Sequence, residues 1–239
     1  MEPLKNIQLI ICDVDDTLVV ARSTVFYAQY GRCVERAIAK YFGVALPVAV
    51  CIANAFRAEG EGAERALFSG DITRVVAEAQ RRAPNYSMLY DAMSALNPEG
   101  EFTHRAATQQ SIEQLARKGV KVIALTSSPT TLSKKILEAS GYTLASFADI
   151  IGYERESGPP KMVDGAAVFR AIAHKHGVAM SEVMAIGDKP EFDVLPAVAA
   201  GATGCVIDTS VEDVVMRDGI LYTADINNVF KRIQENGAL

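Results

Sequence analysis

The sequence lacks several features that would assign it to a particular class of protein. Its four cysteines, at positions 12, 33, 51 and 205, include no CxxC pair, so it indicates neither a disulfide framework, nor a zinc site, nor a redox pair. Basic residues are not in excess, because 24 lysines and arginines stand against 29 aspartates and glutamates. The net charge of −5 disfavours a nucleic-acid partner. Internal repeats and low-complexity tracts are also missing from the sequence.

Long apolar runs are missing as well. The longest one after the first expected strand, from Val44 to Phe56, spans 13 residues and contains Pro47 and Asn54, whereas a transmembrane helix needs about 20. The amino-terminal residues lead into an apolar stretch that ends in aspartates rather than in a small-residue cleavage site, so we expect no targeting segment and no membrane partner. Free thiols suit a reducing compartment, and we expect a soluble, cytoplasmic protein.

The composition is that of a globular protein, with 239 residues of which 49% are hydrophobic and 22% charged. Short apolar runs typical of buried strands alternate with helical patterns that end at glycine. The expected strands are 7–12, 121–125, 150–151, 183–186 and 205–207, and the expected helices are 108–118, 130–140, 164–176, 194–200 and 226–234. This alternation predicts an α/β protein, with a Rossmann-like parallel sheet that carries helices on both faces.

The interval between the first two expected strands is too long for one βαβ unit of about 30 residues. The first strand ends near residue 13 and the second near residue 126, which is 113 positions later. Apolar residues recur in this interval every three to four positions, as in a helix: Phe26, Tyr30, Val34 and Ile38. Further helical stretches are expected near 63–82 and 86–96. We therefore predict a core domain of residues 1–19 and 105–239, with an all-helical domain of residues 20–104 inserted in it. A single larger α/β domain with extra helices is the alternative.

A group of aspartates directly follows the first expected strand. Asp13 and Asp15 are two positions apart, so on an extended chain both side chains face the same way. The carboxyl ends of parallel strands border the ligand cleft of such sheets. Crowded carboxylates are tolerated where a cation compensates them or where one of them holds a proton for acid–base work. A calcium loop would need glycine and glutamate where Leu18 and Thr24 stand, so we reject it. A solvated acidic turn is the remaining alternative.

A second acidic motif, Gly187 to Asp193, follows another expected strand. Asp188 and Asp193 together with Asp13 would form an oxygen-rich cluster of the kind that Mg²⁺ prefers. The alternative for Asp193 is that it caps the helix that follows it.

Two further segments offer groups that could bind an anion. Thr126 and Ser127 follow the second expected strand, where hydroxyls and backbone N–H groups at a helix start can cradle an anion, although such residues are often simple helix caps. Lys161 lies in an expected loop, and Lys189 is a rival cation in the second acidic motif.

These features, in this order, resemble the haloacid dehalogenase-like (HAD) hydrolase superfamily. The resemblance covers residues 1–20 and 105–225. The four motifs of the family have counterparts in DVDDTLV at 13–19, Thr126 after VIAL, Lys161, and GDKPEFD at 187–193. The inserted segment looks like the helical cap that some members carry after the first motif. Two positions depart from the usual pattern: Asp16 stands where the family often has glycine, and Met162 where proline is common.

The resemblance implies a magnesium-dependent phosphatase that hydrolyses a small phosphorylated metabolite. Asp13 would be the nucleophile that forms an aspartyl-phosphate, and Asp15 the general acid and base. The implied metal ligands are Asp13, Asp15 through its backbone carbonyl, Asp188 and Asp193. The implied phosphate-binding residues are Thr126, Ser127 and Lys161.

Other activities are compatible with the same motifs. A phosphomutase of the superfamily would share all four, and a 2-haloacid dehalogenase would share the fold. The dehalogenases do not carry an aspartate two positions after the nucleophile, because a halide leaves without a proton, so Asp15 favours phosphate esters. A non-catalytic binding protein on the same scaffold is the alternative from another class. We expect a monomer or a homodimer.

Overall fold

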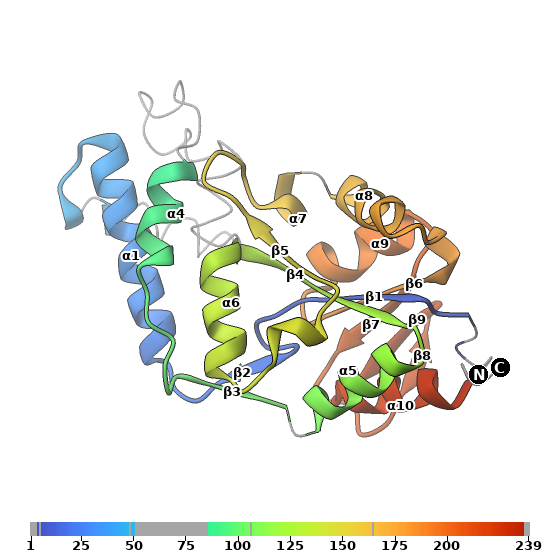
Figure 1. The fold of residues 1–239 in the computed structure, drawn as a ribbon. Helices are drawn as coiled ribbons and strands as arrows, with labels where there is room; N and C mark the ends of the chain where they lie inside the picture. Colours follow the sequence, from blue (N-terminus) through green and yellow to red (C-terminus); the bar gives the residue numbers. More distant parts are fainter. Residues whose placement is uncertain are drawn as a thin grey trace.

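The computed structural model describes Leu4 and residues 6–47, 49–50, 86–105, 107–163 and 165–236. Its main feature is a seven-stranded sheet with the strand order β5-β4-β1-β6-β7-β9-β8 (Figure 1). The strands are β1 (Leu9–Cys12), β4 (Lys121–Pro129), β5 (Asp149–Tyr153), β6 (Val183–Gly187), β7 (Thr203–Ile207), β8 (Val215–Arg217) and β9 (Ile220–Thr223). All neighbours pair in parallel except β8 and β9. The predicted Rossmann-like α/β fold is confirmed.

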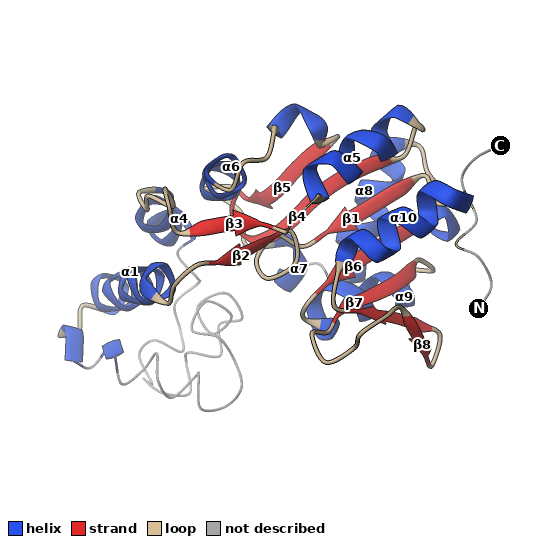
Figure 2. Ribbon diagram, turned by 90° about the horizontal axis from the view of Figure 1, so that it is seen from below, coloured by secondary structure: helices blue, strands red, loops and turns tan. Residues whose placement is uncertain are grey.

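Helices cover both faces of this sheet, as Figure 2 shows. They are α5 (Thr108–Arg117), α6 (Thr130–Ala139), α7 (Pro160–Val163), α8 (Ala166–His176), α9 (Leu195–Ala199) and α10 (Ile226–Asn236), with short turns η3 (Leu144–Ser146), η4 (Met180–Glu182) and the π-helical η5 (Pro190–Val194). In the central strand β1, Leu9 and Ile11 pack with residues of α8 and α9, whereas Ile10 and Cys12 pack with residues of α5 and α10. A strand covered on both faces has no position for a polar residue, which explains its uninterrupted apolar sequence.

The inserted segment begins and ends in strands that the sequence did not predict. β2 (Val19–Ala21) and β3 (Phe102–His104) form an antiparallel pair, with Val20 opposite Thr103. Between them the structure describes α1 (Val25–Phe42) and α4 (Tyr86–Ser94), which pack against each other. Both helices match predicted ones, and α1 ends at Gly43, whose φ of 64° is typical of a helix C-cap. The predicted helical stretch at 63–82 lies outside the described residues, and the division into two domains stays a prediction.

Two other differences from the predicted elements have local causes. β4 continues four residues past the predicted end at 125, because the polar segment up to Pro129 still pairs with β5 after a shift in register. β8 and β9 form a hairpin whose turn consists of Asp218 and Gly219, with φ angles of 49° and 80°. An Asp-Gly pair with two positive φ angles is typical of tight hairpins.

In the described part of the chain, no helix combines the length and the apolar character needed to span a bilayer.

Candidate active site

The candidate site lies where three neighbouring strands end. Asp13 follows β1, Thr126 lies in the carboxyl-terminal half of β4, and Asp188 follows β6. Because β4, β1 and β6 are adjacent and parallel, these residues meet at one edge of the sheet. The backbone N–H of Asp13 donates to the carbonyl of Ile186 at 2.8 Å, so the β1–β6 pairing fixes the start of the acidic loop.

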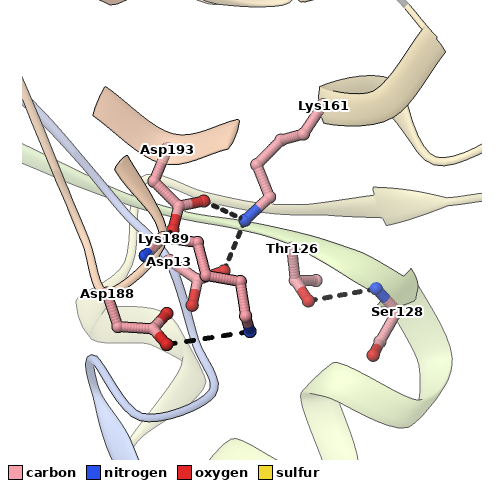
Figure 3. A network of polar contacts seen from close by, with 7 residues as sticks. All are labelled: Asp13, Thr126, Ser128, Lys161, Asp188, Lys189 and Asp193. Carbon is pink, nitrogen blue, oxygen red and sulfur yellow. Dashed lines mark hydrogen bonds and ion pairs between the residues drawn. The ribbon is translucent and has the colours of Figure 1, made fainter. Parts of the chain in front are cut away.

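Lys161 connects two of the predicted acidic residues. It comes from α7, and its amine donates to Oδ1 of Asp13 and, at 2.6 Å, to Oδ1 of Asp193 (Figure 3). All three side chains are buried. Burial alone would lower the pKa of Lys161, but the two carboxylates outweigh burial and raise it above the ordinary value. Lys161, rather than its rival Lys189, is therefore the cation in direct contact with Asp13.

Asp193 is held by its own loop and faces the site. Its Oδ2 accepts a hydrogen bond from the backbone N–H of Lys189 at 3.1 Å. The helix that follows, α9, has no side-chain cap, so the predicted alternative of a helix-capping Asp193 is wrong. Burial and the neighbouring Asp13 raise the pKa of Asp193 to about 7. Gly187 allows this packing, since a Cβ there would lie 2.2 Å from the Cβ of Asp193.

The acidic side chains fit a divalent cation. Asp13, Asp188 and Asp193 each offer a carboxylate oxygen, and these oxygens lie within 4.8 Å of one another. Oδ1 of Asp188 is buried and accepts no hydrogen bond, while its Oδ2 lies 3.7 Å from the amine of Lys189. Burial raises the pKa of Asp188. A buried acceptor without a donor is costly, and a hard cation such as Mg²⁺ would compensate it with ligands of its preferred type.

Asp15 lies two residues after Asp13 and is half-buried. Burial, and then the nearby charge of Asp13, raise the pKa of Asp15 to about 7. A carboxyl group that titrates near neutral pH can both give and take a proton, which is what general acid–base catalysis needs. The next residue, Asp16, has a φ of 58°. This backbone conformation favours glycine, and aspartate is among the few other residues that adopt it, so Asp16 can stand where the family often has glycine.

Thr126 lies beside Asp13 and Lys161 (Figure 3). It is buried, and its hydroxyl accepts a hydrogen bond from the backbone N–H of Ser128 at 3.1 Å. Ser127 is half-buried. The next helix, α6, begins only at Thr130 after Pro129 and has no side-chain cap. Neither Thr126 nor Ser127 is therefore a helix cap.

Sequence reasoning did not find Tyr27, which lies in the first turn of α1. Its pKa is raised, first by burial and then by four carboxylates, those of Asp15, Asp16, Asp188 and Asp13. Its ring packs edge-on to Phe102 of β3 at 6.3 Å, and the side chain is 39% exposed. The sequence offered one signal for this residue: Tyr27 is an aromatic residue that lies outside the apolar stripe of its helix.

Comparison with family models and known sequences gives two findings. A model described as haloacid dehalogenase-like hydrolase matches residues 7–201. No curated protein sequence matches the chain.

Solved structures share the fold over almost the whole chain. A HAD phosphatase from Thermococcus onnurineus is 15% identical, with a TM-score of 0.58 and coverage of 95% of this chain and 97% of that one. The magnesium-bound HAD-hydrolase YfnB from Bacillus subtilis is 15% identical, with a TM-score of 0.57 and coverage of 95% and 98%. A 2-haloacid dehalogenase from Pseudomonas syringae pv. Tomato is 14% identical, with a TM-score of 0.55 and coverage of 96% and 99%. Such identities establish the likeness of the fold alone, and the fold is common to phosphatases and dehalogenases.

Proposed function

The chain belongs to the haloacid dehalogenase-like hydrolase family, and from this premise we propose that it is a magnesium-dependent phosphatase. In this proposal it hydrolyses a small phosphomonoester through an aspartyl-phosphate on Asp13. The observation that carries the proposal is the oxygen cluster of Asp13, Asp188 and Asp193, in which an oxygen of Asp188 is buried without a hydrogen-bond partner. Such a cluster suits a divalent cation, which a dehalogenase does not need.

The first half of the reaction uses the two aspartates of the first motif. A carboxylate oxygen of Asp13 attacks phosphorus and forms the new P–O bond, while the bond to the leaving oxygen breaks. Asp15, protonated below about pH 7, gives its proton to the leaving alkoxide. Mg²⁺, which Asp13, Asp188 and Asp193 would hold, would reduce the repulsion between the anionic nucleophile and the anionic phosphate.

The second half returns the enzyme to its starting state. Asp15, now a carboxylate, takes a proton from a water molecule as that water attacks the phosphorus of the aspartyl-phosphate. The bond between phosphorus and Asp13 breaks and inorganic phosphate leaves. Thr126, Ser127 and Lys161 hold the phosphoryl oxygens through both steps, and Lys161 also fixes Asp13 through their ion pair.

The proposed location is a reducing compartment, the cytoplasm. The free thiols of three described cysteines, Cys12, Cys33 and Cys205, support it.

Hydrolysis of p-nitrophenyl phosphate tests the proposal. We expect release of p-nitrophenol with Mg²⁺ and loss of release with EDTA. Asp13→Asn should lower the rate at least about 1,000-fold, because removal of the catalytic nucleophile costs more than this in a serine protease. Asp16→Asn is the matched control, since it removes an exposed neighbouring carboxylate and should keep activity within about threefold. If folded wild-type protein releases no p-nitrophenol with Mg²⁺ but releases halide from a 2-haloacid, the phosphatase proposal is wrong.

A further inference from the structure

The turn that follows Asp15 is held by residues from distant parts of the chain. Three consecutive carbonyl groups of this turn, those of Asp16, Thr17 and Leu18, accept hydrogen bonds from side chains outside it. Arg105, the first residue after β3, donates from Nη2 to the carbonyl of Asp16 at 2.6 Å and from Nε to the carbonyl of Thr17 at 2.9 Å. The carbonyl of Leu18 accepts from the hydroxyl of Tyr142 at 2.7 Å. These three carbonyls are therefore held from outside the turn.

The guanidinium group of Arg105 also reaches a second loop. Its Nη1 donates to the carbonyl of Ala224, between β9 and α10, at 3.2 Å. Arginine presents its donors in a rigid planar fork, and here that fork joins the turn after β1 to the far half of the sheet. Lysine has a single flexible amine and could replace only part of this arrangement.

The turn needs such support because its own interactions are incomplete. Asp16 has the left-handed φ of 58°, which costs free energy in a residue with a side chain. The hydroxyl of Thr17 is buried and has no hydrogen-bond partner. Within the turn, the backbone N–H groups of Leu18 and Val19 both donate to the carbonyl of Val14, at 2.9 and 3.0 Å. Conformations of this kind persist where their surroundings over-determine them.

We propose that Arg105 is a positioning residue for Asp15. By holding the carbonyls of Asp16 and Thr17, it fixes the turn that aims the Asp15 carboxyl at the leaving oxygen. Arg105 follows β3 and Leu18 precedes β2, so the same contacts join both ends of the inserted segment to the catalytic turn. The inference rests on the proposed function, in which Asp15 protonates the leaving group.

Leaving groups of different basicity distinguish this role from a purely structural one. Phenyl phosphate and p-nitrophenyl phosphate have similar shapes, but the phenolate leaves poorly without a proton and the nitrophenolate leaves well. General acid catalysis contributes about 100- to 10,000-fold. We therefore expect Arg105→Ala to lower kcat/KM for phenyl phosphate at least about tenfold more than for p-nitrophenyl phosphate. Arg105→Lys should lie between wild type and Arg105→Ala, and Asp15→Asn should show the largest difference.

Tyr142→Phe is the matched control. It removes the hydrogen bond to Leu18 without touching the carbonyls of Asp16 and Thr17, so it should lower thermal stability while the ratio of the two kcat/KM values stays at the wild-type level. If Arg105→Ala lowers kcat/KM equally for both substrates, as a structural role predicts, the inference is wrong. Arg105→Lys decides the question in the same way if Arg105→Ala does not fold.

Amide hydrogen exchange over residues 14–19 supplies a readout that does not depend on turnover. We expect faster exchange of the Leu18 and Val19 amides in Arg105→Lys than in wild type, and unchanged exchange would overturn the inference. A wild-type protein without Mg²⁺-dependent phosphatase activity would refute the proposed function, and the exchange result would still show whether Arg105 holds the turn.

Discussion

Replacing Lys161 with methionine removes a buried cation from between two buried carboxylates. The amine contacts Oδ1 of Asp13 and lies 2.6 Å from Oδ1 of Asp193, and the Lys161 side chain is only 4% exposed. Removing one partner of a buried ion pair costs about 3–5 kcal/mol, because the other charge stays buried without compensation. For a chain of this size that cost corresponds to a fall in Tm of roughly 6–20 °C.

The penalty should depend on pH. Burial raises the pKa of Asp193 to about 7, and Lys161 opposes this rise, so the pKa should climb further in Lys161→Met. Below about pH 7 Asp193 takes up a proton, so one of the two buried carboxylates no longer adds an uncompensated charge. We therefore expect a smaller loss of stability near pH 5.5 than at about pH 8.5.

Urea unfolding without divalent cations measures both effects. Lys189→Met is the matched control, since the Lys189 side chain is 58% exposed and its amine lies 3.7 Å from Asp188. An ion pair whose lysine is exposed and whose atoms lie this far apart contributes at most about 1 kcal/mol. Added Mg²⁺ should restore part of the stability of Lys161→Met, because a cation bound by the carboxylates replaces the missing charge. A Lys161→Met protein that unfolds within about 1 kcal/mol of wild type near pH 8.5 would refute this reasoning.

Three further predictions concern pH dependence and two backbone positions. The kcat/KM for phosphate esters should fall as the pH rises above about 7, because Asp15 must carry a proton to serve as the acid; a pH profile that rises through 7 would contradict this. Gly187→Ala would place a Cβ 2.2 Å from Asp193. We therefore expect the free energy of unfolding in urea to fall by about 1–3 kcal/mol and Mg²⁺-dependent turnover to be lost. Gly100→Ala is the control, because Gly100 has a φ of 75° and open space around it. This substitution should lower the free energy of unfolding by about 1–2 kcal/mol and keep activity. Asp16→Gly should relieve the φ of 58° and raise the unfolding free energy by about 1 kcal/mol with turnover unchanged, whereas a loss of stability would show that the Asp16 side chain supports the turn.

The central strands could be predicted because they are buried on both faces. The predicted strands 7–12 and 183–186 contain the uninterrupted apolar runs Leu9 to Cys12 and Val183 to Ile186, and β1 and β6 cover these runs. The short strands β2, β3 and β8 could not be predicted in this way, because each has three residues of which at most one is buried. Their pairing with partners, rather than their own sequence, makes them strands. The Asp218-Gly219 pair is a hairpin signal in the sequence, so the pairing of β8 with β9 could have been predicted from it.

The acidic residues of the site could be predicted because motifs at the ends of parallel strands converge. Asp13 and Asp188 met as expected. The choice between Lys161 and Lys189 needed coordinates, because both lie near acids in the chain and only one is buried among them. Arg105 could not be found from the sequence, because it binds backbone carbonyls, which every residue has and no motif records.

Mass spectrometry of the acid-quenched enzyme tests the central claim most directly. Wild-type protein mixed with Mg²⁺ and p-nitrophenyl phosphate, and quenched during turnover, should yield a peptide that carries one added phosphoryl group on Asp13. The same peptide from Asp13→Asn should be unmodified. Turnover by wild type without a phosphoryl group on Asp13, or with one on another residue, would contradict the account.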